Sequence, residues 1–193
     1  MDYEGVEKHL LARLGKELPG ALPYHGLHHT LAVVEAAERI ARDEGVTGEE
    51  LTLVKTAALF HDSGFLFRYA DNEELGARLA AELLPAFGYS PEQIGVVEGM
   101  VAATRLPQRP ATRLEAIVCD ADLDYLGSDD YHAVAATFRQ ELAAHGRELS
   151  DDAWAALQRE FLGRHRFHTA SSRRRNAAKL AARLEELEPR SPA

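Results

Sequence analysis

The segment LTLVKTAALFHDSGF, residues 51–65, places a polar His-Asp pair at the end of a strongly apolar run. The hydrophobic residues of this segment recur at helical spacing, which predicts an α-helix. Gly64 follows the pair closely and is expected to end the helix. A buried helix end of this kind presents one imidazole, from His61, and one carboxylate, from Asp62.

Apolar residues recur at the same spacing over most of the chain, most clearly in residues 31–45, 74–88 and 153–165. Stretches rich in Gly, Pro, Ser and Asp separate these segments, and Ser, Thr or Asp there can cap the next helix. Because no repeat period is found, a helical solenoid is disfavoured. The sequence therefore predicts an all-α fold of about eight or nine helices. We expect one compact domain over residues 1–188 and a loose tail at 189–193.

Composition limits the class of protein. The 193 residues suit one domain, and a hydrophobic content of 46% can fill a substantial core. A formal net charge of −9 disfavours duplex nucleic acid and anionic membranes as partners, and no apolar run approaches the roughly 18 residues that span a bilayer. The single cysteine, Cys119, has no internal disulfide partner, and the N-terminus lacks the features of a signal peptide. We expect a cytoplasmic monomer or homodimer.

A histidine-rich stretch, YHGLHHT at residues 24–30, follows Pro23, where a helix is expected to begin. His25 and His29 would then lie four positions apart on one helix face and could point at one object. Taken alone, these histidines could equally be solvated or cap the helix.

Three aspartates, Asp120, Asp122 and Asp124, lie within the largely apolar stretch LEAIVCDADLDYLG, residues 114–127. Burying a carboxylate costs free energy unless it is paired or binds a metal. An exposed acidic face is the alternative interpretation. Together with the histidines and the His-Asp pair, however, these carboxylates make a mixed nitrogen and oxygen donor set, which suits a divalent transition metal.

The order of these motifs, a histidine, then His-Asp, then a distal aspartate, resembles the HD superfamily of metal-dependent phosphohydrolases over most of the chain. YHGLHHTLAVVEAA resembles the YHNxxH signature of cyclic-nucleotide phosphodiesterases and their bacterial relatives. AALFHDSGF resembles the HD motif itself, and DADLDYLG resembles the final aspartate motif. By position, the resemblance implies metal ligation by His29, His61, Asp62 and Asp122, with Asp120 as the alternative distal ligand.

The chain departs from the family pattern shortly after the His-Asp pair. Many binuclear members carry a histidine there, in an HExxGA pattern, whereas this chain reads NEELGA and has Asn72 in that place. We therefore expect one divalent ion (Mn, Fe, Co, Ni, Zn or Mg). Glu73 or Glu74 could hold a metal-bound water, although an exposed helix start is the favoured interpretation for both.

The chemistry implied by the resemblance is hydrolysis of a phosphate ester by a metal-activated water. A divalent ion lowers the pKa of a bound water and orients it beside a phosphoryl oxygen. His25 resembles, by position, the general acid of the phosphodiesterases, which supplies a proton to the leaving oxygen. His28 is a weaker alternative for this role, and Asp62 is expected to serve catalysis as well as metal binding.

An anionic substrate also needs positive charge, and residues 161–184 supply it without an acidic residue in the run. The favoured part is RHRFHT, residues 164–169, because Phe167 can anchor it while its neighbours face outward. We expect three of its side chains to bind the substrate: Arg164, Arg166 and His168. Residues 169–172 could cap the following helix and help to bind a phosphate. Arg105, at another expected helix end, is a further candidate, and the remaining cations suit a solvated face.

The sequence therefore predicts a hydrolase that acts on a phosphate ester of a nucleotide or a related small phosphorylated metabolite. One alternative is a domain that has lost turnover and senses a nucleotide or binds a partner; the complete set of ligand positions speaks against it. Another is an HD-type di-iron oxygenase, which Asn72 makes less favoured.

Overall fold

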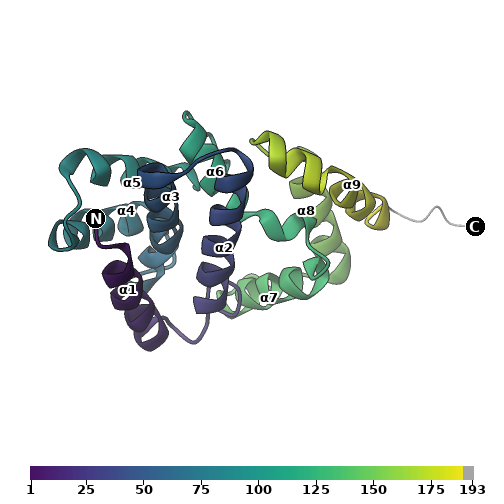
Figure 1. Cartoon of the computed structure of the whole chain (residues 1–193). Helices are drawn as coiled ribbons and strands as arrows, with labels where there is room; N and C mark the ends of the chain where they lie inside the picture. Colours follow the sequence, from purple (N-terminus) through teal and green to yellow (C-terminus); the bar gives the residue numbers. More distant parts are fainter. Residues whose placement is uncertain (189–193) are drawn as a thin grey trace, which may run out of the picture.

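Six helices surround the larger of two hydrophobic cores in the computed structural model, which describes residues 1–188 (Figure 1). They are α1 (Tyr3–Glu17), α2 (Leu27–Asp43), α3 (Gly48–Phe60), α4 (Asn72–Leu83), α5 (Pro91–Ala103) and α6 (Arg113–Asp122). Helix α3 is apolar on several sides because α1, α2, α5 and α6 all pack against it. The His-Asp pair at its end therefore lies deep in the molecule.

Three further helices form a smaller core on the other side of α2 (Figure 1). They are α7 (Tyr131–Ala144), α8 (Asp151–Arg164) and α9 (Ala170–Glu186). The short 3-10 helix η3 (Asp124–Gly127) connects the two cores, because it directly follows α6 and packs against α7 and α9. Two other 3-10 helices, η1 (Ser63–Leu66) and η2 (Leu84–Phe87), flank α4.

This architecture confirms the prediction of an all-α fold in one compact domain, since residues 1–188 contain nine α-helices and no strand. None of these helices is both long enough and apolar enough to cross a lipid bilayer. The tail expected at residues 189–193 lies outside the described residues.

Helix α2 begins later than the sequence predicted. The expected start was directly after Pro23, but the helix begins at Leu27. The reason is tertiary: the backbone amides of Tyr24 and His25 donate to Oε2 of Glu141, at 2.9 and 3.0 Å. His25 therefore lies in the segment before the helix, and not one turn from His29 on its face.

Gly64 also has a different role from the predicted helix stop. Helix α3 ends at Phe60, and Gly64 lies within η1. A Cβ atom at this position would lie 1.9 Å from the backbone oxygen of Asn72. The glycine is needed because the chain after the His-Asp pair passes directly against the start of α4.

Candidate active site

Four side chains predicted as metal ligands converge where α2, the end of α3 and the end of α6 meet. Nε2 of His29 lies 3.2 Å from Nε2 of His61. Oδ2 of Asp62 lies 3.4 Å from the His29 nitrogen and 3.1 Å from the His61 nitrogen. Oδ1 of Asp122 lies 3.3 and 3.7 Å from the same two atoms. We call these four residues the His/Asp cluster.

The His/Asp cluster has the features of a site for a divalent ion. Ligand bonds of about 2.0–2.2 Å place neighbouring donor atoms about 2.9–3.5 Å apart, and four of the five separations given above lie in this range. Oδ2 of Asp62 is buried, and the nearby histidine nitrogens do not meet hydrogen-bond geometry with it, so it has no such partner among the described residues. A buried carboxylate oxygen in this state is costly unless it binds a cation. The mixed donor set suits a transition metal.

The atoms of these predicted ligands that point away from the cluster form hydrogen bonds with neighbouring groups. Nδ1 of His61 lies 2.8 Å from the carbonyl oxygen of Ala58, which leaves Nε2 facing the cluster. The amide of Asn72 donates to Oδ1 of Asp62 at 3.1 Å, and Gln108 donates to Oδ2 of Asp122 at 3.2 Å. Asn72, which stands where the family pattern has a histidine in many binuclear members, therefore holds the predicted ligand Asp62.

The charged groups of the cluster shift each other's pKa. Burial lowers the pKa of His61, but the Asp62 and Asp122 carboxylates and the Ala58 carbonyl together outweigh this effect and raise the pKa to about 9. Burial raises the pKa of Asp62, but His61 and His25 lower it by more, so that Asp62 is ionised. The raised pKa of His61 favours its protonated form, and a metal ion bound at the cluster would compete with that proton.

Asp120, the alternative distal ligand, faces away from the cluster. Its fully buried carboxylate accepts hydrogen bonds from the backbone amides of His168 and Thr169, at 2.7 and 2.8 Å, and from the Thr169 hydroxyl at 2.7 Å. Thr169 caps α9, as expected, by accepting from the Ser172 amide. Asp120 thus binds the amides directly before α9, and Oε1 of Glu44 accepts a hydrogen bond at 2.7 Å from the Ser171 amide in its first turn, where a phosphate was expected.

His25 lies beside the cluster, with its ring centroid 5.9 Å from that of His29. Its Nδ1 forms a hydrogen bond with Oε1 of Glu141, and its ring packs on Phe65 with the centroids 4.4 Å apart. Burial lowers the pKa of His25, but Asp62 and then Glu141 raise it by more, so the net change is upward. This direction favours the protonated ring that a general acid requires.

Glu141 is a site residue that the sequence prediction missed. It is fully buried on α7, and besides the contacts above it accepts a hydrogen bond from the Tyr69 hydroxyl at 3.1 Å. A signal was present in the sequence, because Glu141 directly precedes Leu142 at the edge of the apolar stripe formed by Tyr131, Ala135 and Leu142. An acid in an apolar stripe needs a partner, which suggests a polar site nearby.

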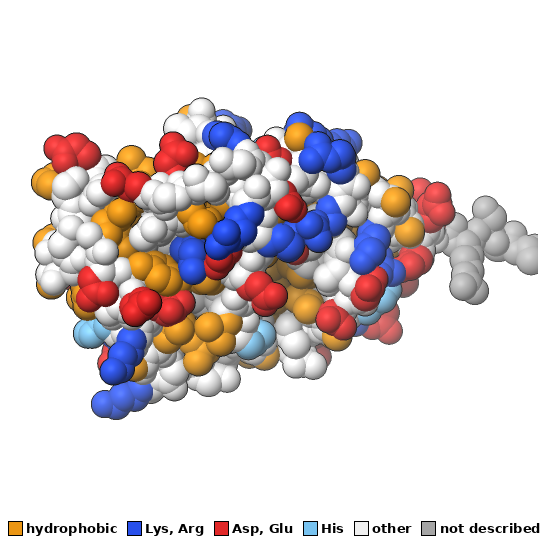
Figure 2. All heavy atoms as spheres, viewed as in Figure 1, with side chains coloured by type: hydrophobic (Ala, Val, Ile, Leu, Met, Phe, Trp, Pro, Cys, Tyr) orange, Lys and Arg blue, Asp and Glu red, His pale blue; other side chains and the backbone are white. Residues whose placement is uncertain are grey.

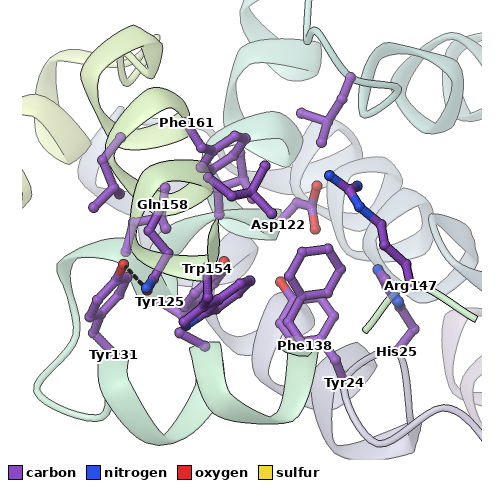
Figure 3. A pocket seen from close by; sticks show the side chains of 16 residues that line it. Tyr24, His25, Asp122, Tyr125, Tyr131, Phe138, Arg147, Trp154, Gln158 and Phe161 are labelled. Atoms are coloured by element: carbon purple, nitrogen blue, oxygen red, sulfur yellow. Dashed lines mark hydrogen bonds between the residues drawn. The ribbon is translucent and has the colours of Figure 1, made fainter. Parts of the chain in front are cut away.

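A cavity of about 250 Å³ adjoins the cluster, and we call it the aromatic cavity (Figure 3). Asp122, His25 and Arg147 lie at one end of it, and its walls come largely from aromatic side chains of η3, α7 and α8. Arg147, in the loop between α7 and α8, forms no ion pair with the described residues and was also missed.

The three predicted phosphate-binding residues Arg164, Arg166 and His168 line a second cavity, of about 500 Å³. The two cavities share four apolar lining residues: Leu106, Leu123, Leu157 and Phe161. Arg164 is 81% exposed and pairs with Glu160 at 2.9 Å, whereas Arg166 donates to the Gly163 and His165 carbonyls. All three remain predictions as substrate contacts.

Other predicted residues lie outside these cavities. Arg105 pairs with Asp71 at 3.6 Å and lines neither cavity. His28 is exposed, and Glu74 pairs with Arg78 on the surface of α4, in agreement with an exposed helix start.

Most Lys and Arg side chains of α9 lie at the protein surface. Figure 2 shows Lys and Arg side chains across the face over α2 and α9, with acidic side chains between them. Arg175 pairs with Asp43 at 2.9 Å, and Lys179 pairs with Asp129 at 2.8 Å. Arg173 donates to the carbonyls of Phe167 and His168. This part of the basic run is therefore a charged surface.

Comparison with solved structures shows the same fold in distant proteins. A predicted HD superfamily hydrolase from an uncultured Thermotogales bacterium has a TM-score of 0.66 at 20% identity, over 95% of this chain and 88% of that one. Bacillus subtilis YpgQ, in complex with ADP, has a TM-score of 0.68 at 20% identity, over 97% and 94%. A Lactobacillus plantarum protein has a TM-score of 0.65 at 19% identity, over 97% and 95%.

No curated protein matches the chain significantly. A family model, however, agrees with the similarity of fold. Residues 26–124, about half of the chain, match the HD domain, and this range contains all four residues of the His/Asp cluster. The match confirms the resemblance found in the motifs. The chain therefore belongs to the HD domain family.

Proposed function

We propose that this protein is a metal-dependent phosphohydrolase that cleaves a phosphate ester of a nucleotide or a related small phosphorylated metabolite. The observation that carries the proposal is the His/Asp cluster, in which Oδ2 of Asp62 has no hydrogen-bond partner among residues 1–188, beside a histidine held by a buried glutamate. His29, His61, Asp62 and Asp122 would hold the ion. When bound, a divalent ion supplies a more acidic water and offsets the charge of the phosphate.

His25 supplies the proton in this proposal. Because its Nδ1 is bound to Glu141, its Nε2 is the nitrogen that can give a proton to the leaving oxygen. Glu141 acts as a positioning residue, since it fixes both the ring and the backbone of His25. The burial of these groups excludes water and strengthens the electrostatic interactions between them and a substrate.

Positive charge near the cluster supports an anionic substrate. Arg147 lies at the same end of the aromatic cavity as Asp122, and Arg164, Arg166 and His168 line the adjoining second cavity. These donors suit phosphate oxygens. A nucleotide is favoured among phosphate esters because the structure of YpgQ, which has the same fold, was solved with ADP.

The test is metal analysis of the purified protein, combined with a screen of phosphorylated metabolites in the presence of Mn²⁺, Co²⁺, Ni²⁺ and Mg²⁺. We expect one bound ion per chain and release of phosphate or of a phosphorylated product. Asp62→Asn should lose the ion, and Asp129→Asn, at an exposed position shortly after η3, is its matched control. Metal binding without turnover of any phosphate ester would support a nucleotide-sensing or partner-binding domain, and two irons per chain with oxygen consumption would support an oxygenase.

A further inference from the structure

We infer that the aromatic cavity binds a planar heteroaromatic ring, such as a nucleobase, and that Gln158 recognises the polar edge of this ring. The inference rests on the proposed function, because the phosphate would lie at the end formed by Asp122 and His25. The inference goes beyond the proposed function because it assigns a binding site to the part of the substrate that does not react.

The walls of the cavity suit a flat ring. Six aromatic side chains line it: Tyr24, Tyr125, Tyr131, Phe138, Trp154 and Phe161. The rings of Tyr24 and Phe138 lie 5.2 Å apart between centroids, and those of Phe138 and Trp154 lie 6.3 Å apart. Because the faces of aromatic rings stack readily on the faces of nucleobases, a cavity of this composition favours a planar occupant.

The size of the cavity limits the occupant to about one ring system. Pockets for drug-sized ligands are typically about 300–1,000 Å³, and this cavity has about 250 Å³. The rest of a nucleotide would have to lie outside it. The sugar and the phosphate would extend past Tyr24, whose ring centroid is 4.8 Å from that of His29, toward the His/Asp cluster.

Gln158 gives the cavity a directed polar group (Figure 3). The buried Tyr131 hydroxyl donates to Oε1 of Gln158 at 2.8 Å, which fixes the orientation of the amide. The Nε2 group then has no hydrogen-bond partner within residues 1–188 and can donate to a ring nitrogen or a carbonyl oxygen. A pure hydrocarbon ring would leave this donor unsatisfied, so the site favours a heteroaromatic ring over a hydrocarbon ring.

The chain offers its own reporter, because Trp154 is the single tryptophan and lines the cavity. The metal-loaded full chain is titrated with uridine, cytidine, adenosine and guanosine, which carry no phosphate, and tryptophan fluorescence is followed. We expect saturable quenching by at least one nucleoside. Gln158→Leu should raise its dissociation constant about three- to tenfold, since one hydrogen bond is lost. Phe138→Ala should raise it about tenfold through lost stacking.

Gln140→Leu, an exposed change on α7, is the matched control and should leave the titration unchanged. Gln158→Glu keeps the acceptor for Tyr131 but removes the donor, so it should weaken binding even if Gln158→Leu fails to fold. The ratio of catalytic efficiencies for the nucleotide and for ribose 5-phosphate, which lacks the ring, should fall in both Gln158 variants.

Two results would overturn the inference: no quenching by any nucleoside, or quenching that neither Gln158→Glu nor Phe138→Ala alters, because the ring would then bind elsewhere. If only the proposed function is wrong, the result is distinguishable: nucleosides bind in the cavity as described, but no phosphate ester is hydrolysed.

Discussion

The two halves of the molecule contribute different parts of the candidate site. The α1–α6 half carries the larger core and all four residues of the His/Asp cluster. The η3 and α7–α9 half contributes Glu141, Arg147 and most of the cavity walls. The HD domain match covers residues 26–124 and so ends as the second half begins. The likeness to the family therefore includes the proposed metal chemistry, whereas the residues proposed for recognition lie beyond it.

The halves also differ in how firmly they hold their polar groups. His61 is 1% exposed and His29 is 7% exposed; His29 lies on α2 and His61 directly follows α3, two helices packed in the large core. Arg147 and Arg164, by contrast, lie exposed at a loop and at a helix end. Substitutions in the first half should therefore remove function, and most substitutions in the second half should only weaken it.

The largest effect is expected in the first half, from Asp62→Ala. This change removes a proposed metal ligand and leaves Asp122 as the one carboxylate of the His/Asp cluster, so bound metal and hydrolysis should both be lost. Elemental analysis and the rate on the best substrate measure the effect, with Asp129→Ala as the control. A metal-free variant with full activity would refute the metal mechanism.

His25→Ala tests the boundary between the halves. Metal content should stay normal, while turnover falls by about 10²- to 10⁴-fold if a general acid is lost. The loss should be smaller on a nitrophenyl phosphate, because its leaving oxygen needs no proton. Equal losses on this substrate and on the natural one would exclude the acid role, and lost metal would make His25 a ligand.

Glu141→Gln tests whether the second half affects catalysis through the pKa of His25. The Glu141 carboxylate raises the pKa of His25, so its loss should lower that pKa. Because the general acid works in its protonated form, the alkaline limb of the pH–rate profile should move to lower pH, with a rate loss of about ten- to hundredfold at pH 8. A merely structural role would reduce the rate at every pH without moving the limb.

Substitution of the cavity arginines should have a smaller effect. One charge-assisted hydrogen bond to an anion is worth roughly 1.5–3 kcal/mol, so Arg147→Ala should lower kcat/KM about ten- to hundredfold with normal metal content. Arg164→Ala and Arg166→Ala should do the same if the second cavity also binds phosphate. Arg175→Ala is the control, since Arg175 pairs with Asp43. If all three variants keep wild-type kinetics, recognition of the phosphate does not depend on these arginines.

The smallest effect concerns stability in the second half. Burial lowers the pKa of His165 from 6.5 to about 4. The unfolded chain therefore binds a proton between these pH values while the folded chain does not, so stability should fall as the pH drops from about 6.5 to 4. The expected loss is roughly 1–3 kcal/mol, measured by urea unfolding. In His165→Gln this part of the pH dependence should disappear; if it persists, another group is responsible.

Short-range information in the chain was enough to predict much of the first half. Helical spacing predicted the all-α fold, and the His-Asp pair and the distal aspartates were visible as polar groups in apolar helices. Such patterns are local, because a helix has a fixed period and a buried carboxylate needs a partner wherever it occurs. The choice between Asp120 and Asp122 was not local, since two residues along a helix change the direction of a side chain by about 200°.

The sequence by itself therefore determined the fold class, the family and the set of candidate ligands. Only the tertiary structure decided that Asp122 faces the cluster while Asp120 binds the start of α9, that α2 begins at Leu27, and that Glu141 holds His25. The physical reason is distance along the chain. Glu141 lies 116 residues from His25, and no local pattern specifies which buried acid meets which backbone amide until both cores have packed.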